Sequence, residues 1–204
     1  MNTILTKYIN GLVSEYDLID EKRKSDLKLL ADYVSNKLSE GPVSLIFICT
    51  HNSRRSHISQ IWAQIAVYQN DHANITTYSG GTEATAFNPR AVRAMQDAGI
   101  DIIQHDTSSN PKYQITYADD AAAITAFSKK YSDTFNPQKD YCAVMTCTDA
   151  DEACPVVIGA DERISLPYID PKRADDTAQE TEEYAKRCRQ IAREMLYAFS
   201  LVGE

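Results

Sequence analysis

The chain has 204 residues, of which 43% are hydrophobic and 25% charged, so it is long enough for one globular domain with a sizeable core and an appended subdomain. Its net charge of −8 at pH 7 argues against nucleic acid and anionic membrane surfaces as partners. The sequence has no run of 18 apolar residues and no signal-peptide pattern at its start. Its five cysteines are an odd number clustered late in the chain, which favours a reducing cytoplasm.

Residues 1–40 are expected to be helical. Gly41-Pro42 ends this segment, and the simplest arrangement is two helices in antiparallel contact, which serve packing or dimerisation rather than chemistry. The two apolar stripes have helical spacing and consist of Ile4, Leu5, Tyr8, Ile9, Leu12 and Val13, and of Leu27, Leu30, Ala31, Val34 and Leu38.

The stretch from Cys49 to Ser56 is the centre of the chain's chemistry. An apolar run over residues 43–48 precedes it and predicts a buried strand, and apolar residues at the spacing of an amphipathic helix follow it from Ile58 to Ala66. Cys49 therefore lies in a loop between a strand and a helix N-terminus. Free backbone N–H groups and the helix dipole favour an anion at such a place.

This loop suits a tetrahedral oxyanion. Arg55 follows Cys49 with five residues between them, which allows the loop to wrap around the anion and the guanidinium fork to close it. The same positive field is expected to lower the pKa of the thiol from about 8.5 into the range of about 3.5–7.5, so that the thiolate attacks phosphorus or arsenic. The alternative is a core cysteine, which six following polar residues, two of them arginines, disfavour.

The next elements alternate between strand and helix. Residues 74–79 have the pattern of a strand that a glycine pair closes, and Asn88-Pro89 opens a helix with an N-cap and a first-turn proline. This helix ends at Gly99. The order β-α-β-α predicts parallel strands joined by right-handed crossovers.

Residues 106–140 interrupt this rhythm. Residues 113–117 alternate like a strand, and residues 123–127 suit the second arm of a hairpin. An alanine-rich helix that begins at Asp119 is the alternative. We expect the hairpin, within an insertion of about residues 108–138.

Two further strands and a helix complete the chain. Residues 141–146 form a buried strand, residues 164–166 a short last strand, and about residues 176–200 a C-terminal helix. In open α/β sheets the functional site lies beyond the carboxyl ends of the strands.

Three candidate functional residues, Cys49, Cys147 and Asp170, each follow a predicted strand and can therefore meet at one edge of the sheet. A carboxylic acid beside the Cys49 loop can protonate an oxygen leaving group. Asp-Pro is otherwise an ordinary turn, so the pair Asp170-Pro171 is by itself a weak signal.

Cys147 and Cys154 bracket a segment of three acids and small residues, which we expect to be an exposed, mobile loop. Two cysteines in such a loop can exchange disulfides if the loop can close. A zinc site and two unrelated free thiols are the alternatives, and the zinc site lacks an evident set of four ligands. Cys142 and Cys188 are expected in the core.

The pattern Cys-x5-Arg-Ser, with Asn52 at its fourth position, resembles the low-molecular-weight protein tyrosine phosphatases and equally the arsenate reductases built on that fold. In both families an Asp-Pro after the last strand carries the general acid, and Asp170 matches that place. The resemblance implies a three-layer α/β sandwich with a central parallel four-stranded sheet. It would be formed by residues 41–204, after an N-terminal helical extension of residues 1–40.

The later segments resemble the thioredoxin-coupled arsenate reductases more closely. These carry a cysteine, an acidic loop and a Cys-Pro pair at this spacing, as Cys147 and Cys154 do here, and segments 78–84 and 88–92 also look like that family. The phosphatases usually carry a tyrosine pair just after the Asp-Pro, where this chain has a lysine and an arginine.

The resemblance implies an arsenate reductase without a cofactor. The Cys49 thiolate would attack arsenate held by the loop amides and Arg55, with Asp170 protonating the departing oxygen and Ser56 donating to the cysteine sulfur. The loop residues expected to bind the substrate are Thr50, His51, Asn52, Ser53 and Arg54.

The remaining steps would be a disulfide relay. Cys147 attacks Cys49 and expels arsenite, and Cys154 resolves that bond and leaves a 147–154 disulfide for thioredoxin or a similar dithiol protein to reduce. The principal alternative is a phosphatase acting on phosphotyrosine or aryl phosphates through a phosphocysteine. A third is a partner-binding module without catalysis.

Three residues depart from the family pattern. His51 stands where the families usually have glycine, and Arg54 stands where a second loop cysteine is common, which removes one route to a protective disulfide and adds positive charge. Gln60 replaces an acid that some reductases use near a cation site, so no bound potassium or other metal is expected.

Overall fold

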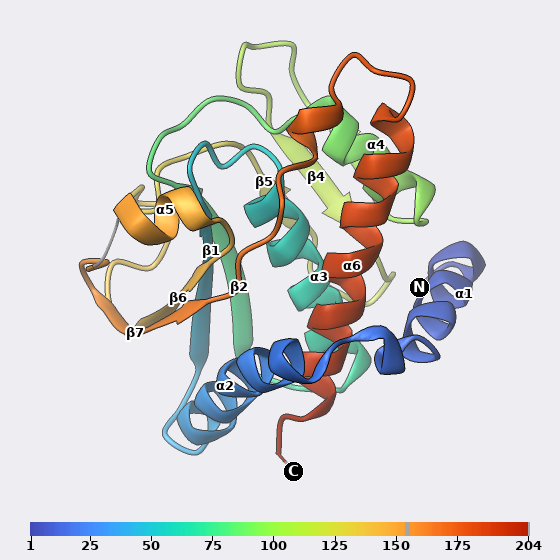
Figure 1. The fold of residues 1–204 in the computed structure, drawn as a ribbon. Coiled ribbons are helices and arrows are strands. Elements are labelled where there is room, and N and C mark those ends of the chain that lie inside the picture. Colours follow the sequence, from blue (N-terminus) through green and yellow to red (C-terminus); the bar gives the residue numbers. More distant parts are fainter. Residues whose placement is uncertain (154–155, 204) are drawn as a thin grey trace.

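A computed structural model of the chain describes residues 1–153 and 156–203 (Figure 1). At its centre lies a four-stranded sheet in the order β2-β1-β6-β7, in which every pairing is parallel. These strands are β1 (Val43–Cys49), β2 (Ile75–Gly81), β6 (Tyr141–Met145) and β7 (Ala160–Ser165). The α-helices are α1 (Thr3–Val13), α2 (Glu21–Leu38), α3 (Arg55–Gln69), α4 (Pro89–Asp97), α5 (Thr148–Ala153) and α6 (Glu180–Ser200). The predicted α/β architecture with a central parallel sheet is confirmed.

Side chains that alternate along β1 build a core on each face of the sheet. Leu45 belongs to the larger core, which includes residues of α1, α2, α3, α4 and α6, whereas its neighbour Ile46 belongs to a smaller core beside α5. Because both faces are covered, β1 is apolar at nearly every position. Cys49 and Cys147 both belong to the smaller core, so the two thiols lie on the same side of the sheet.

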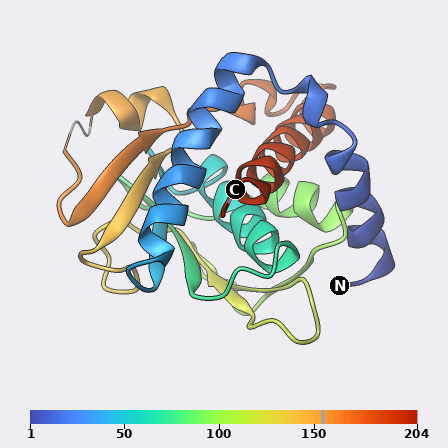
Figure 2. The same cartoon turned by 90° about the horizontal axis from the view of Figure 1, so that it is seen from below.

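The N-terminal helices do not form the antiparallel pair that the sequence favoured. α1 and α2 each pack against α6, and α2 also contacts β1 and β7 (Figures 1 and 2). Most of the two predicted apolar stripes is buried, but Ile4 and Val13 of the first stripe are exposed. Helix α6 contacts both helices at different places along its length. The segment that joins α1 to α2 is bound to α6 by an ion pair between Glu15 and Arg189, in which Nε and Oε2 are 3.1 Å apart.

The insertion contains the predicted hairpin, and the alternative helix from Asp119 is wrong. Strand β4 (Tyr113–Thr116) pairs antiparallel with β5 (Ile124–Ala126) and, on its other side, with β3 (Asp101–Gln104). The sequence did not reveal β3, because it is four residues long and buries only Ile102.

The chain returns from the hairpin along the end of β2. Gly81 N donates to Lys129 O and Tyr131 N donates to Gly81 O, each at 2.9 Å. Because of this pairing, β2 includes Gly80 and Gly81, although this glycine pair was expected to end the strand. A Cβ on Gly81 would lie within 2.4–2.7 Å of backbone atoms of residues 50, 52 and 83, so only glycine fits between the strand and the Cys49 loop.

The segment after Cys147 is helical at its start, so the prediction of a loop was wrong for this part, although Thr148, Asp149 and Glu152 are exposed as expected. Its acids Asp149 and Asp151 lie in the first turn of α5, where the helix dipole favours negative charge. Asp151 also accepts hydrogen bonds from Arg163 and from Ser165 Oγ of β7. Cys154 and Pro155 lie outside the described residues.

The other boundaries shift by a few residues. α6 begins at residue 180 rather than 176, and β7 begins at residue 160 rather than 164. Asn88 caps α4 by accepting from Arg90 N, with Pro89 in the first turn, as predicted. No helix within the described ranges has both the length and the apolar character needed to cross a membrane.

Candidate active site

The loop between β1 and α3 turns its carbonyl oxygens outward. The carbonyl oxygens of residues 49, 50, 51 and 53 accept hydrogen bonds of 2.8–3.2 Å from Thr82 N, Glu83 N, Ser128 Oγ and Asn88 N, in that order. The backbone N–H groups of residues 51–55 have no acceptor among the residues that the structure describes. They lie at the N-terminus of α3, so the loop offers free donors and a positive dipole end to an anion.

Cys49 lies at the foot of this loop with 3% of its surface exposed. Its sulfur is 3.1 Å from Ser56 Oγ, and that hydroxyl oxygen also accepts a hydrogen bond from Asn52 Nδ2 at 2.8 Å. Because the serine oxygen is used as an acceptor by Asn52, its own proton is free to point at the sulfur. Asn52 has a positive φ of 43°, a conformation that asparagine tolerates better than most residues.

Arg55 and Asp170 meet beside the loop. Arg55 donates from Nη2 to Asp170 Oδ2 at 2.7 Å and from Nη1 to Tyr168 O at 3.0 Å. Asp170 also caps the short helix η2 (Pro171–Ala174) by accepting from Lys172 N at 3.0 Å. The buried Arg55 Nε has no partner within the described chain, so the guanidinium retains a donor for a ligand.

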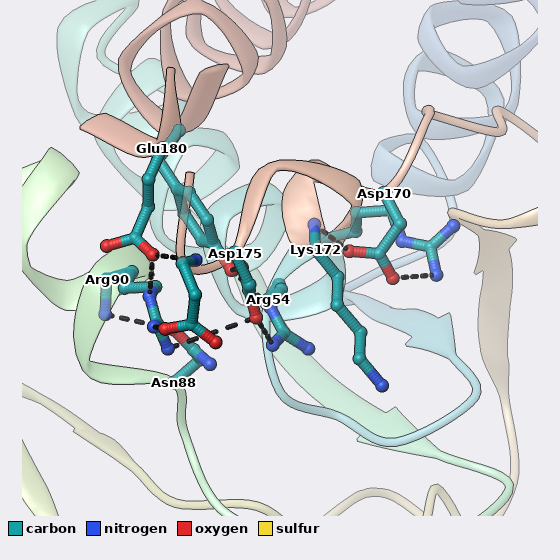
Figure 3. A network of polar contacts seen from close by, with 10 residues as sticks. Arg54, Asn88, Arg90, Asp170, Lys172, Asp175 and Glu180 are labelled. Carbon is teal, nitrogen blue, oxygen red and sulfur yellow. Dashed lines mark hydrogen bonds and ion pairs between the residues drawn. The ribbon is translucent and has the colours of Figure 1, made fainter. Parts of the chain in front are cut away.

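The Arg54 guanidinium points towards Asp175 (Figure 3). Its Nε donates to Tyr184 Oη at 2.6 Å, and its Nη2 lies 3.0 Å from Asp175 Oδ2. The sequence placed Arg54 among the residues that bind the substrate, but its guanidinium binds these two side chains. The role of Arg54 in substrate binding therefore stays a prediction for its backbone N–H, and the partners of its side chain could not be foreseen because neither is near it in the sequence.

The other loop residues occupy different places. His51 is half-exposed at the rim, where its Nε2 lies 3.5 Å from Glu83 Oε2. Ser53 is nearly buried and links the loop to α4 through its carbonyl oxygen. Thr50 faces the smaller core, and its Oγ1 is 3.5 Å from the sulfur of Cys147.

Cys147 is fully buried at the start of α5. Its sulfur accepts a hydrogen bond from Ala150 N at 3.4 Å in addition to the contact with Thr50. The tertiary structure therefore brings this thiol next to the loop that Cys49 begins, although 97 residues separate Thr50 from Cys147 in the sequence.

The other two described cysteines are core residues, as expected. Burial raises the pKa of both thiols, and that of Cys188 rises to about 12 even though Trp62 donates to its sulfur. No group of three or more metal-ligating side chains is found in the described part of the chain. Gln60, one of the three departures from the family pattern, donates a hydrogen bond from Nε2 to Thr77 O at 3.0 Å.

The insertion supports the loop from behind. Lys129 N donates to Asn52 Oδ1 at 2.9 Å, which fixes the amide that in turn orients Ser56. The Lys129 side chain is itself buried, with its Nζ 4.7 Å and 5.2 Å from the ring centroids of Phe127 and Phe135. Burial lowers the pKa of Lys129 to about 8. Burial, and secondarily the charge of Lys129, holds the pKa of His57 well below its usual value.

The lowered pKa of Lys129 predicts a pH-dependent effect of Lys129→Met. Between pH 8 and 10.5 the unfolded chain binds more protons here than the folded one, so the cost of burying the charged amine is full below pH 8 and disappears above pH 10.5. We expect the free energy of unfolding of the variant, relative to wild type, to fall by about 3 kcal/mol between pH 7 and pH 11.

Urea denaturation at several pH values measures this difference. Lys130→Met, at the exposed neighbouring lysine, is the matched control and should show a constant offset. A constant offset for Lys129→Met as well would contradict the lowered pKa.

Comparison with known proteins places this chain in a family. No family model matches the sequence. The arsenate reductase of Bacillus licheniformis is 30% identical over 164 residues, which cover 79% of this chain and 97% of that protein. The chain belongs to the family of arsenate reductases and low-molecular-weight protein tyrosine phosphatases. It is therefore an enzyme of this family.

Solved structures share the fold of this enzyme. A low-molecular-weight phosphotyrosine phosphatase from Vibrio cholerae superposes with a TM-score of 0.52 at 14% identity, covering 76% of this chain and 93% of that one. An arsenate reductase in its phosphate-binding state superposes with a TM-score of 0.51 at 16% identity, covering 79% and 99%. At these identities the likeness concerns the fold alone.

Sequence reasoning missed three contacts around the enzyme's loop. The side chains of Asp175 and Tyr184 hold Arg54, and the backbone N–H of Lys129 supports Asn52. The available signals were slight: a second acid five residues after Asp170, and a tyrosine within the predicted C-terminal helix. Neither signal indicates a contact with a loop more than 70 residues earlier.

Proposed function

We propose that the enzyme reduces arsenate to arsenite with Cys49 as the nucleophile and Cys147 and Cys154 as a disulfide relay. The observation that carries this proposal is the position of Cys147, whose sulfur lies 3.5 Å from Thr50 Oγ1 beside the nucleophile loop. Hydrolysis of a phosphoester needs no second thiol at this place. The 30% identity to an arsenate reductase points in the same direction.

In the first step the Cys49 thiolate attacks arsenic(V), and an arsenate oxygen leaves as water after protonation by Asp170. The free amides of the loop and Arg55 stabilise the charge on the remaining oxygens. Ser56, oriented by Asn52, donates to the sulfur and steadies its anionic form. The product is a covalent adduct of arsenic(V) on Cys49.

In the second step the Cys147 thiolate attacks the sulfur of Cys49. The S–As bond breaks, its electron pair remains on arsenic, and arsenite leaves as arsenic(III). Cys154 then attacks Cys147, which releases Cys49 as a thiolate and forms the 147–154 disulfide. A dithiol protein such as thioredoxin supplies two electrons to reduce that disulfide.

The relay requires α5 to unwind. A six-residue helix is about 9 Å long, whereas the Cα atoms of a disulfide lie within about 7 Å of each other. An intact α5 therefore keeps its own first and last residues apart, and we expect the bond between the two cysteines of the relay to form only when this helix opens. The contacts of Asp151 with Arg163 and Ser165 are the ones that α5 must give up.

The test is Cys147→Ser. We expect multiple-turnover release of arsenite in the presence of thioredoxin to fall by at least about 10³-fold, because no thiol remains to displace arsenic from Cys49. Activity towards p-nitrophenyl phosphate should stay within about threefold of wild type, since that reaction needs only water to resolve the intermediate. Cys142→Ala, which removes a core thiol, is the matched control and should keep both activities.

Unchanged arsenite turnover by Cys147→Ser, or by Cys154→Ser, would contradict the relay. A high kcat/KM for aryl phosphates, unaffected by Cys147→Ser, together with no arsenite release by the wild type would favour the phosphatase. That second candidate is supported by the grouping of Cys49, Arg55 and Asp170, which is sufficient for hydrolysis through a phosphocysteine.

A further inference from the structure

Two neighbouring arginines bind two carboxylates of one short segment (Figure 3). Arg55 binds Asp170 at 2.7 Å and Arg54 binds Asp175 at 3.0 Å, and the two aspartates flank η2. The end of the nucleophile loop is thus attached to the segment that carries Asp170 at two points. Both guanidinium groups are largely buried, so these ion pairs are less screened by solvent than surface pairs are.

The ion pair of Arg55 with Asp170 and that of Arg54 with Asp175 have different roles. Under the proposed function, Arg55 must present its guanidinium to the oxyanion, and it then shares or gives up its bond with Asp170. Asp170 must nevertheless stay beside the leaving oxygen, because a displacement of about 1 Å is enough to reduce proton transfer severely. A second attachment that does not take part in binding the oxyanion is therefore needed.

Arg54 has the geometry for this second attachment. Its Nε donates to Tyr184 Oη at 2.6 Å, and Tyr184 donates in turn to Asp175 Oδ1 at 2.7 Å, so the three side chains form a closed triangle. Tyr184 is buried on α6. The two groups that the Arg54 guanidinium contacts belong to the segment after η2 and to α6, not to the nucleophile loop.

Arg90 of α4 supports the same segment from its other side. Its guanidinium lies 2.6 Å from Asp176 Oδ1 and 2.7 Å from Glu180 Oε2 (Figure 3). Asp176 N also donates to Glu180 Oε2 at 2.6 Å. The chain between η2 and α6 is therefore fixed to α4 and α6 independently of Arg55.

We propose that Arg54 is a positioning residue for the general acid. Through Asp175 and Tyr184 it holds the segment of Asp170 against the nucleophile loop when Arg55 turns to the substrate oxyanion. This inference rests on the proposed role of Asp170 as the acid, and it holds for arsenate reduction and for phosphoester hydrolysis alike.

The test compares Arg54→Met with wild type on aryl phosphates whose leaving groups differ in acidity. For phenyl phosphate, whose leaving group needs a proton, we expect kcat/KM to fall about 10- to 100-fold. For 2,4-dinitrophenyl phosphate, which leaves without protonation, the fall should be less than about threefold. The Kd for inorganic phosphate should also change less than about threefold, because Arg54 does not face the anion.

Two further variants make the result specific. Asp175→Ala should show at least the same dependence on the leaving group, because Asp175 also accepts from Tyr184 and lies 3.9 Å from Arg90 Nη1. The double variant Arg54→Met/Asp175→Ala should be no worse than Asp175→Ala alone, because that substitution already removes the Arg54 attachment. Arg173→Met is the matched control, since Arg173 joins the same segment to Glu183 of α6 without reaching the loop. It should leave the dependence on the leaving group unchanged.

An equal fall in kcat/KM for all leaving groups, or a large loss of phosphate binding, would overturn the proposal and make Arg54 a substrate-binding residue. If Arg173→Met showed the same dependence of kcat/KM on the leaving group, the proposal would also be overturned, because loss of any contact of this segment would then produce the effect. Failure of the reductase assignment is distinguishable, since a wild type that cleaves aryl phosphates but releases no arsenite contradicts the relay and leaves this comparison intact.

Discussion

Replacing Cys49 with serine is expected to reduce both arsenite release and aryl phosphate hydrolysis by at least about 10⁴-fold. A serine hydroxyl at this place is not ionised near neutral pH, so the attacking anion is lost. The loop amides and Arg55 remain, and the Kd for inorganic phosphate should therefore stay within about tenfold of wild type. Enzyme assays and isothermal titration calorimetry with phosphate measure the two quantities separately.

Retained phosphate binding also shows that the serine variant is folded. Cys188→Ala is the matched control, because Cys188 is a buried thiol that contacts Trp62 and lies on α6, away from the loop. It is expected to lower stability by the removal of one buried sulfur while leaving the activities near wild type. Substantial activity of Cys49→Ser would contradict the assignment of the nucleophile.

The second large effect is expected for Arg55→Lys, which should lower kcat/KM for either reaction by about 10²- to 10³-fold. Lysine keeps the positive charge but loses the planar fork that donates to Tyr168 O and Asp170 and that can bind an oxyanion with two parallel N–H groups. The Kd for inorganic phosphate should rise as well, which separates this variant from Arg54→Met. Steady-state kinetics and phosphate titration provide both measurements.

Arg93→Lys is a suitable control for the arginine substitution, because Arg93 forms only an exposed ion pair with Asp97 on α4. It should leave kcat/KM and phosphate binding unchanged. If Arg55→Lys bound phosphate as tightly as wild type, the oxyanion would depend on the loop amides alone, and the proposed role of the guanidinium would be wrong.

Much of the candidate site could be predicted because its central part is local. Eight consecutive residues contain Cys49, the loop, Arg55 and Ser56, and the strand before them and the helix after them fix how the loop must turn. The partners that follow later strands, Cys147 and Asp170, could be placed at the same edge because parallel strands align their carboxyl ends.

Other features needed the tertiary structure. Both a short helix and an exposed loop suit the acidic residues of α5, and the packing of Cys147 and the bonds of Asp151 to β7 favour the helix. The stripes of α1 and α2 could serve each other or a third helix, and only the position of α6 decided between these.

The sequence by itself determined the nucleophile loop, the parallel sheet that carries it and the hairpin of the insertion, because periodicity, capping and the spacing of Cys49 and Arg55 act within a few residues. The tertiary structure decided the distant partners of the side chains in the nucleophile loop. Arg54 binds an aspartate 121 residues away, and the Asn52 side chain accepts from Lys129 N, 77 residues further along the chain. Such contacts form only after the elements have packed, since a hydrogen bond requires its two atoms to lie within about 3 Å.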